Sequence, residues 1–172
     1  MSNFLSDTYL WQGERNARSI KEFMVLQEMF EVGLPVPRPI AARVKRQGIF
    51  YSCDLITSRI NNSSSIGDRL NENTMSADLW KNIGSCIASF HMKGFYHHDL
   101  NIENILIDSY QNVFLLDFDK ALQMDPSKSM AQKNINRLQR SLNKNYSNPS
   151  KPFPKAEWEI LIAEHSKQLN QD

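Results

Sequence analysis

The stretch His97-His98-Asp99-Leu100-Asn101-Ile102-Glu103-Asn104 decides the fold, because it is a polar loop placed directly before two short apolar strands. The strands are predicted at 105–107 and 113–116, with turn-forming residues between them. The segment Asp117-Phe118-Asp119 comes directly after the second strand. Because a hairpin returns the chain to its starting point, we expect the polar loop and this final segment to meet in one cleft.

Helical patterns lie on both sides of this segment. Residues 76–93 carry one apolar stripe at helical spacing, and Gly94 is a natural stop for that helix. Two further helices are indicated by the apolar spacing of Ile135, Leu138 and Leu142, and by that of Trp158, Leu161, Ile162 and Leu169. The rear part of the chain is therefore expected to be mainly helical.

The front part reads as one helix followed by two strands. The helix is predicted at 19–32 from the spacing of Phe23, Met24, Leu26, Met29 and Phe30. Gly33 follows its end and Pro35 prevents its continuation. Strands are predicted at 40–44 and 49–57, joined by a turn at Lys45-Arg46-Gln47-Gly48.

The polar run at 61–65 is predicted to be a loop that separates the two parts. We therefore divide the chain into 1–60 and 61–172, and the fold class that we expect is α+β.

Length and composition exclude several classes of protein. A chain of 172 residues with 41% hydrophobic and 23% charged residues has the composition of a globular domain. The net charge of +1 gives no sign of a nucleic-acid partner, and no apolar run of about 18 residues indicates a transmembrane helix. Cys53 and Cys86 are too few and too far apart for a metal motif, so we expect two reduced thiols.

The pattern from His97 to Asp119 fits the signature H-x-D-L-x-x-x-x-N followed by D-F-x, which is typical of kinases. Phosphoryl transfer needs a carboxylate beside the acceptor hydroxyl and oxygen ligands for magnesium a few ångströms away. Asp99, Asn104 and Asp117 can supply them. The competing interpretation of His91, His97 and His98 as zinc ligands is weak, because neighbouring histidines in a turn cannot easily converge on one ion.

Longer strings resemble one family. They are Gly33–Ala42, Phe50–Thr57, Tyr96–Asn101 and Leu115–Asp119, and they resemble the 3-deoxy-D-manno-octulosonic acid (Kdo) kinases of the lipopolysaccharide kinase family. The resemblance covers about Thr8 to Leu142. It implies a protein-kinase-like fold with two lobes, in which the N-terminal lobe is incomplete and the C-terminal lobe mainly helical. It also implies transfer of the γ-phosphate of ATP to the 4-hydroxyl of a Kdo sugar on a lipid A precursor.

The resemblance also implies residue roles. Asp99 stands at the position of the catalytic base, and Asn104 and Asp117 at those of magnesium ligands. Asp119 stands where protein kinases have glycine, and adds charge near the metal. The adenine of ATP is expected at a hinge between Thr57 and Ile60 that includes Ser58, with Leu106 and Leu116 as its apolar floor.

Glu22 has two interpretations from the sequence. It stands where a kinase helix carries the glutamate that orients the ATP-binding lysine. Ser19 and Glu22 also have the spacing of a capping box, in which Glu22 only satisfies a backbone amide. Both interpretations stay open at this point.

One kinase element has no counterpart in the printed sequence. Only 21 residues precede Glu22, and they hold a single glycine, Gly13, and one lysine, Lys21. A glycine-rich loop over the phosphates and a strand lysine are therefore not recognisable. We expect weak or no kinase activity from this polypeptide as written.

Cations without acids fill the region between Pro126 and Ala156. Such a patch can add about 1 kcal/mol per residue at an anionic membrane surface, although a solvated helix face is the simpler interpretation. Nucleic acid is disfavoured because no base-stacking motif accompanies the charge. The resemblance implies a cytoplasmic protein, peripheral on the cytoplasmic face of the inner membrane, and the cations that we expect to contact the membrane include Lys128, Lys133, Arg137, Arg140 and Lys144.

Two other functions fit the same pattern. One is a different small-molecule phosphotransferase, related to aminoglycoside or choline kinases, which would share the loop and the aspartate after the hairpin. The other is a catalytically silent binding module that keeps the fold.

Overall fold

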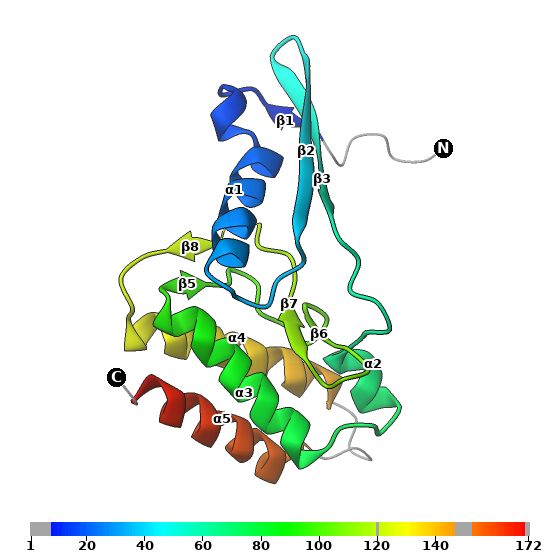
Figure 1. Ribbon diagram of the computed structural model, residues 1–172, viewed down its shortest axis with the longest axis vertical. Coiled ribbons are helices and arrows are strands. Elements are labelled where there is room, and N and C mark those ends of the chain that lie inside the picture. The colour runs from blue at the N-terminus through cyan, green and yellow to red at the C-terminus, as the bar shows by residue number, and fades with distance from the viewer. Residues whose placement is uncertain (1–7, 120, 147–152, 171–172) are drawn as a thin grey trace. The chain divides into compact units, whose positions relative to one another are not determined.

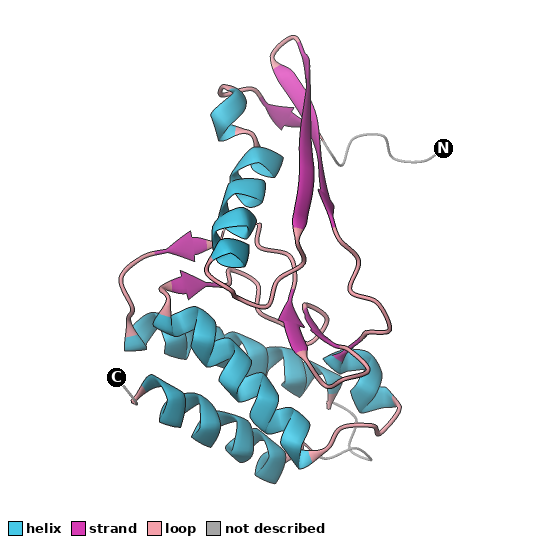
Figure 2. Ribbon diagram, viewed as in Figure 1, coloured by secondary structure: helices cyan, strands magenta, loops and turns pink. Residues whose placement is uncertain are grey.

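The computed structural model describes residues 8–119, 121–146 and 153–170. The chain divides into two compact units, Met1–Arg59 and Ile60–Asp172 (Figure 1). Both units contain helices and strands (Figure 2), so the fold mixes α and β structure. Among the described residues, none of the helices combines the length and apolar character that crossing a bilayer requires.

The first unit is one helix with a three-stranded antiparallel sheet. In chain order its elements are β1 (Tyr9–Leu10), a 3-10 turn (Glu14–Asn16), α1 (Arg18–Glu31), β2 (Pro39–Gln47) and β3 (Phe50–Thr57). The strand order is β1-β3-β2, and Gly48 has a φ of +63° in the turn between β2 and β3. The predicted hairpin is confirmed, with β2 longer than expected.

Helix α1 begins differently from the prediction. Ala17 is its N-cap, and no side chain caps the helix. Ser19 lies inside the helix, is buried, and donates from Oγ to the carbonyl oxygen of Arg43 on β2 at 3.2 Å. The capping-box interpretation of Ser19 and Glu22 is therefore wrong, because the serine hydroxyl binds the sheet instead of the start of the helix.

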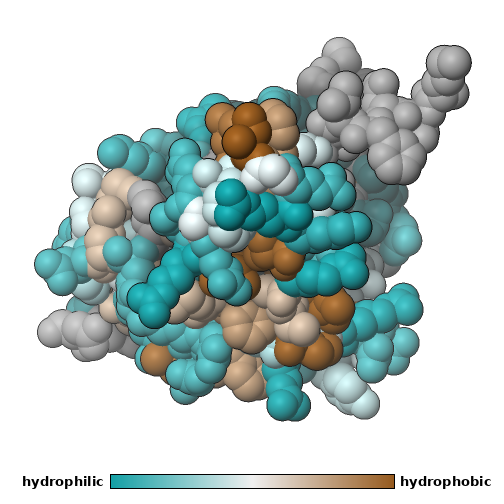
Figure 3. All heavy atoms as spheres, turned by 90° about the horizontal axis from the view of Figure 1, so that it is seen from above, coloured by the Kyte–Doolittle hydropathy of each residue, from teal (hydrophilic) through white to brown (hydrophobic). Residues whose placement is uncertain are grey.

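The apolar face of α1 is narrower than predicted. Leu26 and Met29 are buried, whereas Met24 and Phe30 are 60% and 44% exposed. Met24 lies about 200° around the helix from Leu26, so both cannot face the sheet. The face of the molecule in Figure 3 likewise shows hydrophobic residues among hydrophilic ones.

Helix α1 ends as predicted. Gly33 has a φ of +76°, and its amide donates to the carbonyl of Phe30 at 3.1 Å. The amide of Leu34 donates to the carbonyl of Met29 at 2.9 Å, which completes the pattern that a glycine after a helix typically allows.

The second unit packs helices around short sheets. Its elements are β4 (Ser64–Ser65), α2 (Ile66–Asn71), α3 (Ala77–Met92), β5 (Phe95–Tyr96), β6 (Ile105–Ile107), β7 (Val113–Leu115), β8 (Leu122–Gln123), α4 (Lys128–Asn145) and α5 (Lys155–Leu169). The strands form one sheet in the order β4-β6-β7 and a pair β5-β8. Helices α3 and α5 lie side by side (Figure 1).

Helix α3 is close to its prediction. Ser76 caps it by accepting a hydrogen bond from the amide of Leu79 at 3.3 Å, and Gly94 follows its end with a φ of +75°. Its apolar stripe is buried, with Trp80 and Ile83 each at most 1% exposed. Cys86 on the same helix is buried, which raises the pKa of its thiol to about 12, and both cysteines are free.

The run at 61–65 is only partly a loop. Ser64 and Ser65 form β4, which pairs with β6, and Ser65 then caps α2 in a capping box with Asp68. The prediction missed β4 and α2, because a serine-rich run is as compatible with a loop as with a strand edge and a helix start.

The hairpin after the polar loop is confirmed. Ile105 pairs with Leu115 and Ile107 with Val113. Asp108 closes the turn, because its Oδ1 accepts from the amides of Tyr110 and Asn112 at 2.8 and 2.9 Å. The inward side chains of both strands lie in the core of the second unit.

The contact between α3 and α5 leads to the first prediction. A Cβ added to Gly84 would clash with the backbone carbonyl oxygen of Leu161. We expect Gly84→Ala to lower the free energy of unfolding by about 1–2 kcal/mol, because the strain of separating two packed helices exceeds the gain of about 1 kcal/mol in helix propensity. Urea unfolding measures the change.

Lys81→Ala is the matched control, since Lys81 is an exposed residue on the same helix. It should stay within about 0.5 kcal/mol of the wild type. A Gly84→Ala variant as stable as the wild type would show that the two helices are not held at this distance.

Candidate active site

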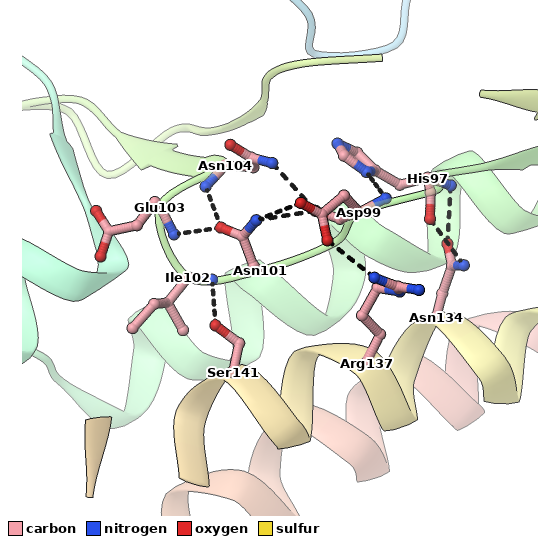
Figure 4. Close-up of polar contacts among 9 residues, drawn as sticks. All are labelled: His97, Asp99, Asn101, Ile102, Glu103, Asn104, Asn134, Arg137 and Ser141. Atoms are coloured by element: carbon pink, nitrogen blue, oxygen red, sulfur yellow. Dashed lines mark hydrogen bonds and ion pairs between the residues drawn. The ribbon is translucent and has the colours of Figure 1, made fainter. Parts of the chain in front are cut away.

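The polar loop at residues 97–104 runs between β5 and β6 (Figure 4). Leu100 and Ile102 are buried at 0% and 6% exposure, and they anchor the loop in the core. Asp99 and Glu103 are exposed. The alternation of anchoring and exposed residues therefore presents polar side chains on the outer side of the loop.

Hydrogen bonds within the loop bring Asp99 and Asn104 together. The side chain of Asn104 donates from Nδ2 to the carbonyl oxygen of Asp99 at 3.0 Å. The Oδ1 atom of Asn101 accepts from the amides of Glu103 and Asn104 at 2.9 and 3.1 Å. Asn101 is thus the residue that bends the loop, a role that the sequence pattern does not predict.

The imidazole of His97 joins the loop to the end of the hairpin. Its Nδ1 accepts from the amide of Asp99 at 3.0 Å, and its Nε2 donates to the carbonyl oxygen of Leu116 at 2.6 Å. These two bonds fix the neutral tautomer. Burial lowers the pKa of His97, against the opposing effects of the Leu116 carbonyl, Asp117 and Asp99.

A backbone hydrogen bond also joins the loop to the end of the hairpin. The amide of Leu116 donates to the carbonyl oxygen of Asn104 at 2.9 Å. Asp117 follows with a φ of +58°, a left-handed conformation that is uncommon for a residue other than glycine. The chain therefore turns sharply at the position where Asp117 reaches the loop.

Asp99, Asn104 and Asp117 line one cavity of about 670 Å³. The loop contributes the rest of one wall of this cavity, and α4 contributes the other. The α4 residues are Arg137, Arg140, Ser141, Lys144 and Asn145. The structure thus brings together the three residues to which the sequence analysis assigned the chemistry.

The other predicted site residues lie elsewhere. Asp119 does not line this cavity, although its amide donates to Oδ1 of Asp117 at 3.4 Å. The residues predicted to hold the nucleotide divide between the units: Glu22, Thr57 and Ser58 belong to the first, and Ile60, Leu106 and Leu116 to the second. None of these six residues lines the cavity.

No local pattern in the sequence predicts the ion pair between Arg137 and Asp99. Arg137 Nη1 lies 2.9 Å from Oδ1 of Asp99, and Nδ2 of Asn101 donates to Oδ2 of Asp99 at 3.3 Å (Figure 4). Both carboxylate oxygens of Asp99 are therefore held in place. The sequence predicts Arg137 only as part of the membrane-facing patch, because a long-range partner leaves no local signal in the sequence.

Asn134 on α4 supports the loop from below. Its Oδ1 accepts from the amide of His97 at 2.9 Å, and its Nδ2 donates to the carbonyl of His97 at 3.1 Å. Oδ1 also accepts from Nε2 of His91 at 3.2 Å. Because His91 donates from Nε2, its Nδ1 is the acceptor for Nε2 of His165 at 2.9 Å.

The histidines are therefore hydrogen-bonded as neutral rings. Burial lowers the pKa values of His91 and His165 to about 4. Among the described residues, no three side chains of His, Cys, Asp or Glu are grouped to hold a metal ion. The zinc interpretation of His91, His97 and His98 is wrong.

The sequence model of the lipopolysaccharide kinase (Kdo/WaaP) family matches residues 1–165. The chain therefore belongs to the lipopolysaccharide kinase (Kdo/WaaP) family. The family that the sequence resembled is confirmed.

Curated relatives in this family are named 3-deoxy-D-manno-octulosonic acid kinase. The relative from Vibrio vulnificus (strain CMCP6) is 41% identical over 140 residues, which are 81% of this chain and 59% of the relative. The relative from Xanthomonas campestris pv. campestris (strain B100) is 37% identical over 155 residues, 90% of this chain and 62% of the relative. The chain thus spans about three fifths of the length of these kinases.

The hydrogen bonds between Asn134 and the polar loop at residues 97–104 lead to a second prediction. Asn134→Ala should lower the free energy of unfolding by about 2–3 kcal/mol, because the change leaves buried polar groups of His91 and His97 without partners. The measurement is urea unfolding at pH 7.5. Asn136→Ala is the control on the same helix, since Asn136 is exposed, and it should change the stability by less than about 0.5 kcal/mol. Equal effects of the two changes would contradict the assigned role.

The buried histidines give a third prediction, on pH. The folded pKa values near 4 lie below the ordinary value of 6.5. The unfolded chain therefore takes up protons first as the pH falls, and stability that is complete above pH 6.5 is lost between 6.5 and 4. Between pH 7 and pH 5 we expect a loss of about 2 kcal/mol for each histidine that stays neutral.

Urea unfolding at a series of pH values measures this loss. In His165→Gln the slope should be shallower, because one titrating ring is gone while an amide can still donate to Nδ1 of His91. A stability that is constant or rises from pH 7 to pH 5 would show that these rings are not held neutral.

Proposed function

We propose that this chain carries the catalytic part of an ATP-dependent Kdo kinase. The reaction is transfer of the γ-phosphate of ATP to the 4-hydroxyl of a Kdo sugar on a lipid A precursor, a step of lipopolysaccharide core biosynthesis. The observation that supports it most is the cavity with Asp99, Asn104 and Asp117 in its wall. The names of the curated relatives supply the class of acceptor.

Asp99 is the proposed catalytic base. Arg137 and Asn101 hold its two carboxylate oxygens, so the carboxylate is oriented before a substrate arrives. The hydroxyl of the acceptor displaces one of these contacts and gives its proton to Asp99 as the phosphoryl group is transferred. The fixed orientation of the carboxylate reduces the entropy cost of aligning acceptor and base.

Asn104 and Asp117 are the proposed magnesium ligands, with Asp119 adding negative charge next to Asp117. Their oxygen atoms are the donors that Mg²⁺ prefers, and the ion typically takes only one or two protein carboxylates together with phosphate oxygens and water. Mg²⁺ bound there would neutralise charge on the phosphates of ATP. Because Asn104 donates from Nδ2 to Asp99, its side-chain orientation is fixed by the loop itself.

The nucleotide site belongs to the same proposal. Its parts are Glu22 as the helix glutamate, a hinge at Thr57, Ser58 and Ile60, and Leu106 and Leu116 beneath the adenine. The two units are then the lobes of a protein-kinase-like fold. Peripheral attachment to the inner membrane through the cations of α4, among them Lys128 and Lys133, completes the proposal.

Two variants at the cavity test the proposal and form the fourth prediction. Asp117→Asn should abolish the magnesium-dependent part of ATP binding, measured by isothermal titration. Asp99→Asn should bind Mg·ATP within about threefold of the wild type and yet lose the phosphate transfer to a Kdo-bearing lipid A precursor that the wild type shows, however slow that transfer is without a recognisable glycine-rich loop. Asp125→Asn is the control, because Asp125 is exposed and lies outside the cavity.

The same assays discriminate the alternatives. A catalytically silent module would give no magnesium-dependent heat with ATP in any variant. A kinase of the aminoglycoside or choline type would phosphorylate those acceptors in preference to Kdo. Either result would overturn the proposed function.

A further inference from the structure

The basic face of α4 lines two cavities. The first is the cavity of about 670 Å³ that holds Asp99, and the second, of about 390 Å³, lies beside His97 and His98. Arg137 and Arg140 line both. The cations that the sequence analysis assigned to a membrane surface are therefore, at these two positions, part of the walls of a site.

The two arginines differ in what they bind. Arg137 is paired with the carboxylate of Asp99. Arg140 has no hydrogen-bond or ion-pair partner among the residues that the structure describes. It lies three residues after Arg137, about 4.5 Å further along the helix axis, a step comparable with the width of one sugar ring. A sugar whose hydroxyl meets Asp99 can therefore place another of its groups beside Arg140.

The substrate class of the relatives identifies that group. An octulosonic acid carries a carboxylate, and guanidinium binds carboxylate through two parallel hydrogen bonds. We propose that Arg140 binds the carboxylate of the Kdo acceptor and so selects an acid sugar for phosphorylation at Asp99. This inference rests on the proposed function and adds to it the residue that recognises the acceptor.

The position of Arg140 favours the acceptor over the phosphates of ATP. The oxygen ligands proposed for Mg·ATP come from the loop and the end of the hairpin, whereas Arg140 comes from α4. Arg137 contacts the proposed base, Asp99, and Arg140 lies three residues further along the same helix. The acceptor must approach this base, so the cation next to Arg137 faces the acceptor.

The fifth prediction is a change in the discrimination between two probes. Free Kdo and its C1 methyl ester have the same hydroxyls, and only Kdo carries the charge. Binding is measured by ligand-observed NMR titration of the full chain. The wild type should bind Kdo at least about tenfold more tightly than the ester, and Arg140→Gln should bind both equally weakly.

Lys128→Gln is the matched control, because Lys128 is an exposed cation on the same helix that lines neither cavity. It should keep the tenfold preference for Kdo. Thermal unfolding of each variant shows whether the fold is intact, and Arg140→Lys provides a second variant that keeps the charge but lacks the forked geometry. It should recover only part of the preference.

The outcomes separate this inference from the proposed function. Equal binding of Kdo and its ester by the wild type would overturn the role of Arg140 and leave the kinase proposal standing. An equal loss in Lys128→Gln and Arg140→Gln would also overturn it, since a diffuse positive field would then suffice. Failure of the wild type to bind Kdo at all, while magnesium-dependent ATP binding persists, would overturn both the acceptor class and this inference.

Discussion

The site depends on the two hydrogen bonds that the neutral imidazole of His97 makes. One ring nitrogen accepts from the amide of Asp99, and the other donates to the carbonyl of Leu116, the residue before Asp117. A protonated ring would present N–H to the amide of Asp99 and lose that bond. Burial disfavours this charged form, so the core of the second unit keeps the two aspartates in one cavity.

Helix α4 contributes to the site through two of its faces. Its buried face carries Asn134. The side chain of Asn134 accepts a hydrogen bond from the backbone amide of His97 and donates one to the backbone carbonyl of His97. Its outer face carries Arg137 and Arg140, which line the cavity. Any rotation of the helix that moved the arginines would break the bonds of Asn134, so the position of the cations is fixed by the same contacts that hold the loop.

The elements that local signals determine were predictable from the sequence. Helix α3 has a serine cap, an apolar stripe and a terminal glycine, and the hairpin after the loop has two short apolar strands around a turn. Helix α2 was missed because Ser65 acts as cap and strand residue at once. Ser19 was misassigned because its partner, the carbonyl of Arg43, is distant in the sequence.

The candidate site shows the same division. Asp99, Asn104 and Asp117 were found because one loop and one hairpin bring them together, which spacing alone can indicate. Asn134 and Arg137 reach the loop from a helix more than thirty residues away, and nothing near them in the sequence marks them. On the proposed function this matters chemically, because two anionic substrates must share one cavity. Loop oxygens with a metal ion suit the phosphates, and a cation from a separate element, α4, suits the carboxylate of an acid sugar.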